Sequence, residues 1–411
     1  MKFKQTEIGK IPVHWRVVSI KEIGKVVGGG TPSTKKKEYF GGSIPWITPK
    51  DLSGYNRKRI QRGERNITEL GLKNSSAKLL PKNTVLLSSR APIGYVAIAD
   101  NPLTTNQGFR SIICDESKII PDYLYYYLKM SKYSLENLAS GSTFKEISGK
   151  VVEEFKIPLP PLEEQRRITR ILSLLDSKIE LNETIIGNIE QLAQTLFKRW
   201  FIDFEFPNEH GEPYRSSGGK MVESELEMIP EGWEIVKLGT IIEITSGKRP
   251  KRRTDKKKIP IIGASKIMGY VEEPLYDEKI IVTGRVGTHG IINRVSYPSW
   301  PSDNTLVIKS KFYETVYHYL KLIDFTALNR GSTQPLITQK DIKEIKILLP
   351  KDKDLIQKFE IYSEKLFELV TQKEQENEKL TDLRDTLLPK LLSGEIELPD
   401  EDEVTEDVMV R

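Results

Sequence analysis

The chain has 411 residues, of which 38% are hydrophobic and 8% aromatic, so it can build two or three domains with apolar cores and is not a disordered chain. The formal net charge is only +5, but the segment after Leu392 is strongly acidic, which leaves the rest of the chain more basic than the total indicates. A single cysteine excludes a disulfide framework, and because no apolar stretch could span a bilayer and the N-terminus is polar, we expect a cytoplasmic protein.

A first globular module is predicted for residues 1–158. It begins with Ile11-Pro-Val-His-Trp15, which leads into a β-branched run, and it closes on a strand-like run that ends in proline, Lys156-Ile-Pro-Leu-Pro160. Short β-branched runs in between alternate with a tyrosine-rich helical piece, Asp122–Leu128. We therefore predict a mixed α/β domain with irregular loops.

A long helix is predicted for residues 159–204. Its apolar residues recur in steps of four and three from Ile168 to Trp200, which is the heptad pattern of a coiled-coil seam. Asn182 occupies a seam position near the centre of this pattern. The following residues, 205–226, contain many turn-forming residues and are predicted to be a linker.

A second module, residues 227–349, repeats the frame of the first. Ile229-Pro-Glu-Gly-Trp233 matches the opening motif, and Gly331-Ser-Thr333 matches Gly141-Ser-Thr143. Trp233 lies 218 residues after Trp15, whereas Gly331 lies 190 residues after Gly141, so the second copy is 28 residues shorter in between. Because the frame is repeated while the interiors differ, the two modules can be held alike and still read different partners.

A second heptad pattern predicts a long helix over residues 350–394, followed by an acidic and disordered tail, 395–411. If the two long helices run antiparallel with their ends aligned, Asn182 faces Lys373 and Glu376 lies one layer away. A shared polar layer of these three residues would fix the register of the pair. The alternative is that they point to solvent at a frayed midpoint.

The fold class predicted is therefore α+β, with two similar mixed α/β domains in a pseudo-twofold arrangement. Two long helices, packed as an antiparallel coiled coil, would separate the domains. The helices would then act as a ruler of about one to one-and-a-half DNA turns, since one turn is about 34–36 Å.

Hydroxyl and basic residues gather in loops at matching positions of the two modules, which favours contact with nucleic acid because lysine and arginine neutralise phosphates. Arginines that follow a strand-end hydroxyl are also candidates for reading guanine. The candidate DNA-binding residues of the first module are Thr31, Ser33, Thr34, Lys35, Lys36, Lys37, Arg57, Lys58, Arg59, Ser89 and Arg90. Those of the second module are Lys248, Arg249, Lys251, Arg252, Arg253, Thr283 and Arg285.

Other interpretations of these loop residues stay open. A run of charges is often only a solvated surface. The amides in Asn106-Gln107 and Asp303-Asn304 could read adenine, but turn chemistry explains them slightly better.

No catalytic centre is found in the sequence. A phosphate-binding Gly-x-x-x-x-Gly-Lys-Ser/Thr loop is missing, and four scattered histidines with one cysteine do not have the spacing of a metal site. The glycine-rich cofactor loop and Asn/Asp-Pro-Pro-aromatic motif of a methyltransferase are also missing. The only nuclease-like trace is Glu-x-Lys at Glu154 and Glu344, which we interpret as charge at a strand edge.

The chain resembles the specificity (S) subunit of type I restriction-modification systems over essentially its whole length. The resemblance is carried by Ile157-Pro-Leu-Pro-Pro-Leu-Glu-Glu-Gln-Arg-Arg-Ile168 at the start of the first helix, by the two Ile-Pro-x-x-Trp motifs, and by the helix ends Thr195–Phe201 and Leu387–Gly394. It implies two target recognition domains that each read half of a split DNA sequence, with the helices setting the unread spacer. In one respect the two helix starts differ, because Gln165-Arg-Arg-Ile168 is matched only loosely by Ile356-Gln-Lys-Phe359.

The resemblance also implies partners for a chain that is not itself an enzyme. Two methyltransferase (modification) subunits would dock on the helices, and a restriction subunit with translocase and nuclease activity would join separately. No cofactor would be bound by this chain, since S-adenosylmethionine, ATP and Mg²⁺ belong to the partner subunits. The alternatives are a coiled-coil scaffold whose end modules bind proteins, and a specificity subunit of a methylation-only or type IIB-like system.

Overall fold

The computed structural model of the chain describes residues 2–140, 145–225, 227–256, 258–285, 290–325 and 337–398. The chain forms two compact units, one of residues Met1–Glu183 with Gln375–Arg411 and one of residues Thr184–Glu374. The repeated Gly-Ser-Thr motifs at 141–143 and 331–333, and residues 399–411 of the acidic segment, lie outside the described residues.

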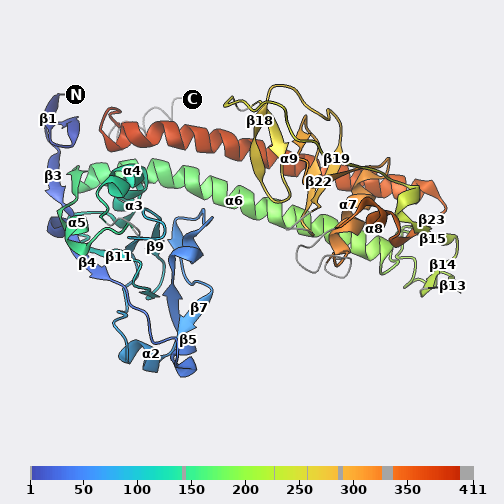
Figure 1. Ribbon diagram of the computed structural model, residues 1–411, viewed down its shortest axis with the longest axis horizontal. Helices are drawn as coiled ribbons and strands as arrows, with labels where there is room; N and C mark the ends of the chain where they lie inside the picture. Colours follow the sequence, from blue (N-terminus) through green and yellow to red (C-terminus); the bar gives the residue numbers. More distant parts are fainter. Residues whose placement is uncertain are drawn as a thin grey trace. The chain divides into compact units, whose positions relative to one another are not determined.

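Two long helices, α6 (Leu162–Phe201) and α9 (Lys353–Leu392), each contribute one half to either unit (Figure 1). In the first unit Asn182 bonds to Asn377 and Asp176 bonds to Arg384. In the second unit the Trp200 ring packs on Phe359. A lower residue number on α6 is matched by a higher one on α9, so the helices pack antiparallel, and the predicted coiled-coil pair is confirmed.

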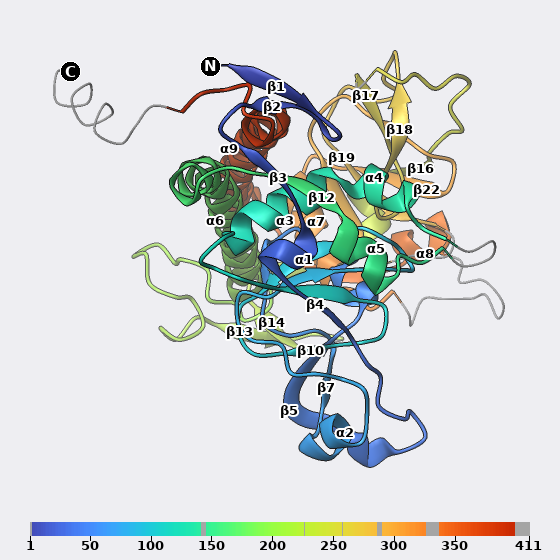
Figure 2. The same cartoon turned by 90° about the vertical axis from the view of Figure 1, so that its left-hand side faces the viewer.

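The first unit contains three small sheets and a larger one around its core (Figure 2). Its strands are β1 (Phe3–Thr6), β2 (Gly9–Pro12), β3 (Arg16–Ser19), β4 (Gly24–Gly28), β5 (Phe40–Ile47), β6 (Arg59–Ile60), β7 (Arg65–Ile67), β8 (Val85–Leu87), β9 (Val96–Ala99), β10 (Thr104–Thr105), β11 (Arg110–Cys114) and β12 (Lys156–Leu159). The larger sheet has the order β4-β11-β8-β9-β6, and the others pair β10-β5-β7, β12-β3 and β1-β2.

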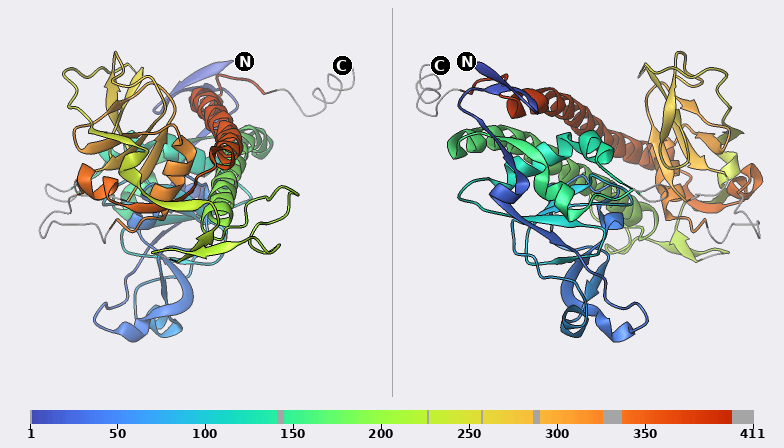
Figure 3. Two further views of the ribbon diagram at one scale, coloured as in Figure 1. Left: turned by 90° about the vertical axis from the view of Figure 1, so that its right-hand side faces the viewer. Right: turned by 60° about the vertical axis from the view of Figure 1, so that its left-hand side comes forward.

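The second unit repeats this topology (Figure 3). Its strands are β13 (Met221–Glu223), β14 (Met228–Pro230), β15 (Trp233–Lys237), β16 (Glu243–Ser246), β17 (Ile259–Ile262), β18 (Ile267–Val271), β19 (Ile280–Gly284), β20 (Ile292–Val295), β21 (Trp300–Pro301), β22 (Thr305–Lys309) and β23 (Lys346–Pro350). The larger sheet has the order β16-β22-β19-β20, beside β18-β17-β21, β15-β23 and β13-β14. The two modules are thus similar mixed α/β domains, as predicted.

Two tyrosine-rich helices of ten residues, α3 (Pro121–Met130) and α7 (Tyr313–Leu322), occupy equivalent places in the two modules. Most of their residues are buried, so the tyrosines belong to the core rather than to a surface stripe. The remaining short helices are α1 (Ile20–Ile23), α2 (Glu69–Lys73), α4 (Lys132–Asn137), α5 (Gly149–Glu154), α8 (Gln339–Lys343), η1 (Lys37–Tyr39), η2 (Pro49–Leu52) and η3 (Leu238–Thr240).

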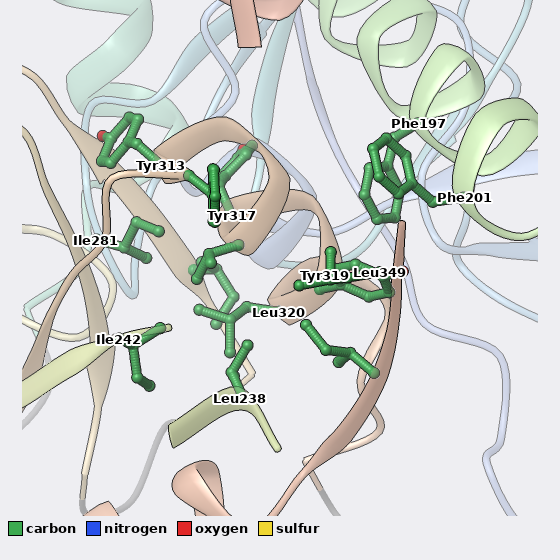
Figure 4. Packing of buried hydrophobic residues seen from close by; sticks show 14 of the residues in the cluster. Phe197, Phe201, Leu238, Ile242, Ile281, Tyr313, Tyr317, Tyr319, Leu320 and Leu349 are labelled. Carbon is green, nitrogen blue, oxygen red and sulfur yellow. The ribbon is translucent and has the colours of Figure 1, made fainter. Parts of the chain in front are cut away.

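Each repeated tryptophan packs at the end of a long helix. Trp15 shares a core with Leu391 and Leu392 at the end of α9, and Trp233 packs on Phe201 at the end of α6. In the second unit Phe197 and Phe201 stack on each other and continue into the side chains of α7 and β23 (Figure 4). These aromatic contacts anchor each module to the helices by apolar burial, which is the largest favourable term in packing.

The acidic segment begins later than the sequence predicts. Ile396 and Leu398 pack on the core of the first unit, and the Arg167 side chain donates to the carbonyl of Leu398. Residues 395–398 are therefore part of the folded unit, because two apolar side chains among the acids find a core to cover.

Candidate nucleic-acid interface

One edge of the larger sheet in the first unit gathers four loops. We call residues 29–31, 88–92, 105–110 and 145–148 the first loop edge. The backbone fixes them together, because Gly29 N donates to Phe109 O (3.3 Å), Ser89 N donates to Gly108 O (2.8 Å) and Ile147 N donates to Ser89 O (3.0 Å). A Cβ on Gly29 would lie 1.9 Å from the carbonyl oxygen of Asn106, so only glycine permits this approach.

The second unit builds the same edge from residues 246–249, 284–285, 300–305 and 337–339, which we call the second loop edge. Gly247 N donates to Thr305 O (3.0 Å), Arg285 N donates to Asn304 O (2.9 Å) and Ile337 N donates to Arg285 O (3.1 Å). Gly247 is again enclosed, with the carbonyl oxygen of Ser302 only 2.1 Å from where a Cβ would lie. The two modules therefore present equivalent backbones with different side chains.

These hydrogen bonds correct the sequence alignment of the candidate arginines by one residue. Ser89 and Arg285 make the same two backbone bonds, so Arg285 is the equivalent of Ser89, and Arg90 follows one position later. A shift of one residue at the end of a strand turns a side chain to the other face. The repeat of hydroxyl and arginine seen in the sequence is thus not an exact structural repeat.

The strand-end hydroxyls predicted to touch DNA are inside the modules. Ser89 and Thr283 are both completely buried, and their hydroxyls have no hydrogen-bond partner among the described residues. Thr283 belongs to β19, and Ser89 lies two residues after the end of β8. Neither hydroxyl reaches the surface of its loop edge, so this burial argues against the predicted contact of Ser89 and Thr283 with DNA.

Arg90 lies at the surface of the first loop edge with a neighbour that the sequence did not single out. Glu146 accepts a hydrogen bond from Arg90 Nη1 (3.4 Å) and a shorter one from Arg110 Nη2 (2.9 Å). Arg110 also donates to the backbone carbonyl of Phe109 (3.0 Å). Arg110 and Glu146 give no motif in the sequence, because they are brought beside Arg90 only by strand pairing.

The hydroxyl and lysine residues after β4 are largely open to solvent. Thr31, at the first loop edge, donates its hydroxyl to the side chain of Gln107. Ser33, Thr34 and the three residues Lys35–Lys37 are exposed, which is consistent with contact to a phosphate backbone. Lys36 Nζ donates to the Tyr39 hydroxyl (3.0 Å), and this hydrogen bond raises the pKa of Lys36.

The basic run Arg57–Arg59 is not part of the loop edge. Lys58 Nζ contacts Asp122 Oδ1 (2.6 Å) and Ser173 Oγ of α6 (2.7 Å), and Arg59 Nη2 contacts Asp122 Oδ2 (3.0 Å). These contacts hold the edge strand β6 on α3 and α6. A structural role thus accounts for Lys58 and Arg59, while Arg57 is exposed.

The basic loop of the second unit follows β16 and is exposed at Lys248, Arg249, Lys251, Arg252 and Arg253. Its first residue is tied to the second loop edge, because Lys248 N donates to Pro301 O (3.0 Å) and Trp300 Nε1 donates to Lys248 O (2.7 Å). Arg285 is also exposed at this edge. Lys248 and Arg285 therefore both belong to the second loop edge, and the other basic residues of the set are exposed in the loop that follows Lys248.

Turn chemistry accounts for one of the candidate amides. Asn106 Oδ1 accepts from the backbone N–H of Gly108 (2.8 Å), which is an Asx turn. The backbone carbonyl of Asn304 accepts a hydrogen bond from the backbone N–H of Arg285. The interpretation favoured from sequence is confirmed for Asn106.

The long helices hold the two modules by different polar contacts. Gln165, fully buried on α6, accepts from Ile120 N (2.9 Å) and donates to Lys118 O (3.1 Å) and Pro160 O (2.9 Å) beside the start of α3. In the second unit Glu360 of α9 accepts from Glu314 N (3.0 Å) and Thr315 N (2.8 Å) at the start of α7. Burial raises the pKa of Glu360. The loose sequence match of the two helix starts thus reflects two different attachments.

A polar layer exists near the middle of the helix pair, but its partners differ from those predicted. Asn182, fully buried, donates to Asn377 Oδ1 (2.8 Å), and Lys178 Nζ contacts Glu376 Oε1 (3.3 Å). The expected partner was Lys373, one helical turn before Asn377. The register differs because the apolar ends of the helices, rather than their aligned termini, decide the pairing: Leu391 and Leu392 pack with Ile168 and Leu172.

The glutamates at the Glu-x-Lys positions form ion pairs at the ends of short helices, α5 for Glu154 and α8 for Glu344, just before β12 and β23. Glu154 pairs with Lys21 (2.6 Å) and Glu344 pairs with Lys237 (2.6 Å). Among the described residues no group of three or more His, Cys, Asp or Glu side chains is placed to hold a metal ion. Within the same residues, no helix is long and apolar enough to cross a membrane.

Comparison with known families gives two matched segments. Residues 12–191 and 230–381 match the family described as type I restriction modification DNA specificity domain. The segments begin at the repeated Ile-Pro-x-x-Trp motifs and include both loop edges.

Proteins similar to this chain cover it either almost completely or in part. The type I restriction enzyme MjaIX specificity subunit of Methanocaldococcus jannaschii is 40% identical over 430 aligned residues, with 96% of each chain covered. The EcoR124I/EcoR124II specificity subunit of Escherichia coli is 35% identical over 184 residues, which cover 43% of each chain. The crystal structure of a type I restriction-modification S subunit from M. genitalium has the same fold, with a TM-score of 0.59 at 22% identity over 97% of this chain and 98% of that one.

Proposed function

Because the chain belongs to the family of type I restriction-modification specificity subunits, we propose that it reads a bipartite DNA sequence with one half-site for each module. It is a specificity subunit with two target recognition domains. The observation that carries the proposal is the pair of loop edges, which share backbone hydrogen bonds but differ in their side chains. Equivalent frames would meet two DNA segments in the same way, and unlike side chains would read unlike bases.

The helices α6 and α9 are proposed to set the unread spacer and to dock two methyltransferase subunits. The antiparallel seam supports this role, since a seam with a fixed polar layer defines one register and so one distance. A restriction subunit with translocase activity would join the same complex. S-adenosylmethionine, ATP and Mg²⁺ would be held by these partners and not by this chain.

Binding to DNA in the presence of the modification subunit tests the proposal. The intact target, identified by mapping methylated sites in cells that express both chains, is compared with a duplex in which both half-sites are scrambled. Affinity for both should fall as salt rises, because counterions are released from phosphates, while the intact target keeps an advantage at moderate salt. Equal affinity for the two duplexes at moderate salt would reject the proposal.

A scaffold that binds proteins through its end modules is the alternative class. It accounts for the helices but not for the exposed basic loops that follow β4 and β16 at equivalent positions. The salt dependence of binding separates the two, since a protein partner held by apolar surface would not release counterions. A methylation-only or type IIB-like system would use this chain in the same way, with a different nuclease partner or none.

A further inference from the structure

Glu146 holds a fixed place at the first loop edge. Its backbone pairs with Ser140 in both directions, with Glu146 N to Ser140 O at 3.0 Å and Ser140 N to Glu146 O at 3.1 Å. The next residue, Ile147, is fully buried and donates its N–H to the carbonyl of Ser89. The backbone that carries the Glu146 carboxylate is therefore fixed by hydrogen bonds, at residue 146 itself and at the next residue.

The two arginines at this carboxylate are held to different degrees. Arg110 has three acceptors, Glu146 (2.9 Å) and the carbonyls of Phe109 (3.0 Å) and Gln107 (3.4 Å), and its side chain is 22% exposed. Among the described residues, Arg90 has one acceptor, Glu146, at the longer distance of 3.4 Å, and its side chain is 36% exposed. Arg110 thus fixes the carboxylate in position, and Arg90 is the arginine that can leave it.

The surroundings of Arg90 make this restraint matter. Arg90, Ile93, Lys145 and Glu146 are among the residues that line a surface depression of about 540 Å³. Without the Glu146 carboxylate, Arg90, Arg110 and Lys145 would outnumber Glu136, the other carboxylate of the depression, and the group would attract any phosphate. With it, a phosphate that approaches Arg90 also meets the negative charge of Glu146, whereas an uncharged base edge is not repelled. A guanine edge offers two acceptors, O6 and N7, in the plane of the guanidinium.

We propose that Glu146 is a specificity-determining residue of the first module, which withholds Arg90 from phosphates and releases it to a base edge. This inference rests on the proposed function, because it presupposes that the first loop edge reads DNA. The second module offers an internal comparison. The residue before Ile337, which is the equivalent of Ile147, is Leu336, so no carboxylate stands at that sequence position, and the exposed arginine of this edge, Arg285, is the equivalent of Ser89 rather than of Arg90.

The test is the substitution E146Q in the full chain bound to its modification subunit. Binding is measured to four duplexes: the intact target, the target with the first half-site scrambled, with the second scrambled, and with both scrambled. E146Q should raise affinity for the doubly scrambled duplex about three- to fivefold, the scale of an exposed ion pair, and lower discrimination at the first half-site by a similar factor. Discrimination at the second half-site should not change.

Three controls decide what the result means. E154Q removes the same charge from an ion pair with Lys21 in the same module and should leave discrimination unchanged. In an R90Q background, E146Q should have no further effect on the first half-site, since Glu146 acts through Arg90. E146D keeps the charge but is too short to hold both arginines, and it should behave like E146Q even if the latter folds poorly.

Unchanged discrimination at the first half-site in both E146Q and E146D would overturn the inference, as would an equal loss at the two half-sites or an equal effect of E154Q. Failure of the proposed function looks different. In that case the wild-type chain itself would not distinguish the intact target from the scrambled duplexes.

Discussion

At the scale of single residues, each loop edge presents one arginine shortly after the end of a strand. Arg90 is half-exposed and follows β8, and Arg285 is exposed and follows β19. The backbone of Arg285 is bonded to Asn304 and Ile337, whereas Arg90 is restrained through its side chain by Glu146. The two arginines are therefore presented differently, although they look equivalent in the sequence.

Replacement of either arginine by glutamine should relax reading of one half-site and leave the other intact. A lost bidentate contact to guanine costs about 1–3 kcal/mol of discrimination at one position. Competition binding with duplexes scrambled in one half-site measures this. Uniform weakening for all duplexes, together with a salt slope reduced by about one, would instead identify that arginine as a phosphate contact.

His318 gives the second unit a dependence on pH. Its ring is buried between Gln194 of α6 (3.0 Å) and Ser363 of α9 (3.2 Å), and burial lowers its pKa from 6.5 to about 3. The unfolded chain then binds a proton below pH 6.5 that the folded chain refuses until about pH 3. Stability is therefore fully present above pH 6.5 and is lost as pH falls, by at most about 1.4 kcal/mol per pH unit.

The measurement is urea unfolding of the wild type and of His318→Gln between pH 7 and pH 5. The raised pKa of Glu360 acts in the opposite direction, since the folded chain then takes up a proton more readily than the unfolded chain as pH falls. The comparison of the two proteins cancels this contribution. The wild type should lose stability relative to the variant on acidification, and parallel pH profiles would contradict the assignment.

At the scale of elements, the centre of the helix pair holds a buried pair of asparagines, and one polar atom of this pair has no hydrogen-bond partner among the described residues. Asn182 donates to Asn377, but the Asn182 carbonyl oxygen is buried without a hydrogen-bond partner among the described residues. Such a group costs stability, and a polar residue at a seam position is tolerated where it fixes register. The pair therefore favours one alignment of α6 and α9 at the expense of stability.

Replacement of both asparagines by leucine should raise the midpoint of thermal unfolding, because the seam becomes continuously apolar. The single change Asn182→Leu should lower it, since the side-chain oxygen of Asn377 loses the amide donor from which it accepts a hydrogen bond. Calorimetry measures the midpoints, and light scattering should show that the double variant forms additional oligomers. An equal loss of stability in the single and double variants would show that the pair is simply stabilising.

At the scale of the whole molecule, the repeat preserves a frame and varies its interior. Gly247 lies 218 residues after Gly29, Thr305 lies 196 after Phe109, and Ile337 lies 190 after Ile147. The second module is therefore shorter in two intervals, one equivalent to Gly29–Phe109 and one equivalent to Phe109–Ile147. The second interval has lost fewer residues, and in the first module it contains α4.

An exchange of residues 29–114 with residues 247–309 should exchange the half-sites. The exchange leaves α3 and α7 packed on the same long helices as before. Each of these two helices pairs a carboxylate with an arginine of the exchanged segment, Asp122 with Arg59 and Glu314 with Arg294. Mapping of methylated sites should show the two half-sites in reversed order. An unchanged target would place the reading residues outside the exchanged segments.

The control exchange extends to α3 and α7. Tyr126 of α3 donates to Asp176 (2.5 Å), which also binds Arg384, whereas His318 of α7 requires Gln194 and Ser363. The extended exchange should therefore destabilise both units, which circular dichroism on heating would detect. Its full stability would show that these attachments are interchangeable.

The sequence alone determined the elements whose pattern is local and periodic. The heptads of α6 and α9, the tyrosine helices and the repeated Ile-Pro-x-x-Trp frame follow from spacing along the chain, and the family is visible in motifs at the helix starts and ends. Periodic burial of one face leaves a signature in any single strand or helix, so no tertiary information is needed.

Only the tertiary structure decided which charged residues meet. It paired Lys58 and Arg59 with Asp122, buried the hydroxyls of Ser89 and Thr283, and brought Arg110 and Glu146 to Arg90. It also matched Arg285 with Ser89 and Asn182 with Asn377, each displaced from the pairing predicted from sequence. The physical reason is that strand register and helix stagger are set by the burial of apolar side chains far away in the chain, and a displacement of one residue or one turn changes every polar partner.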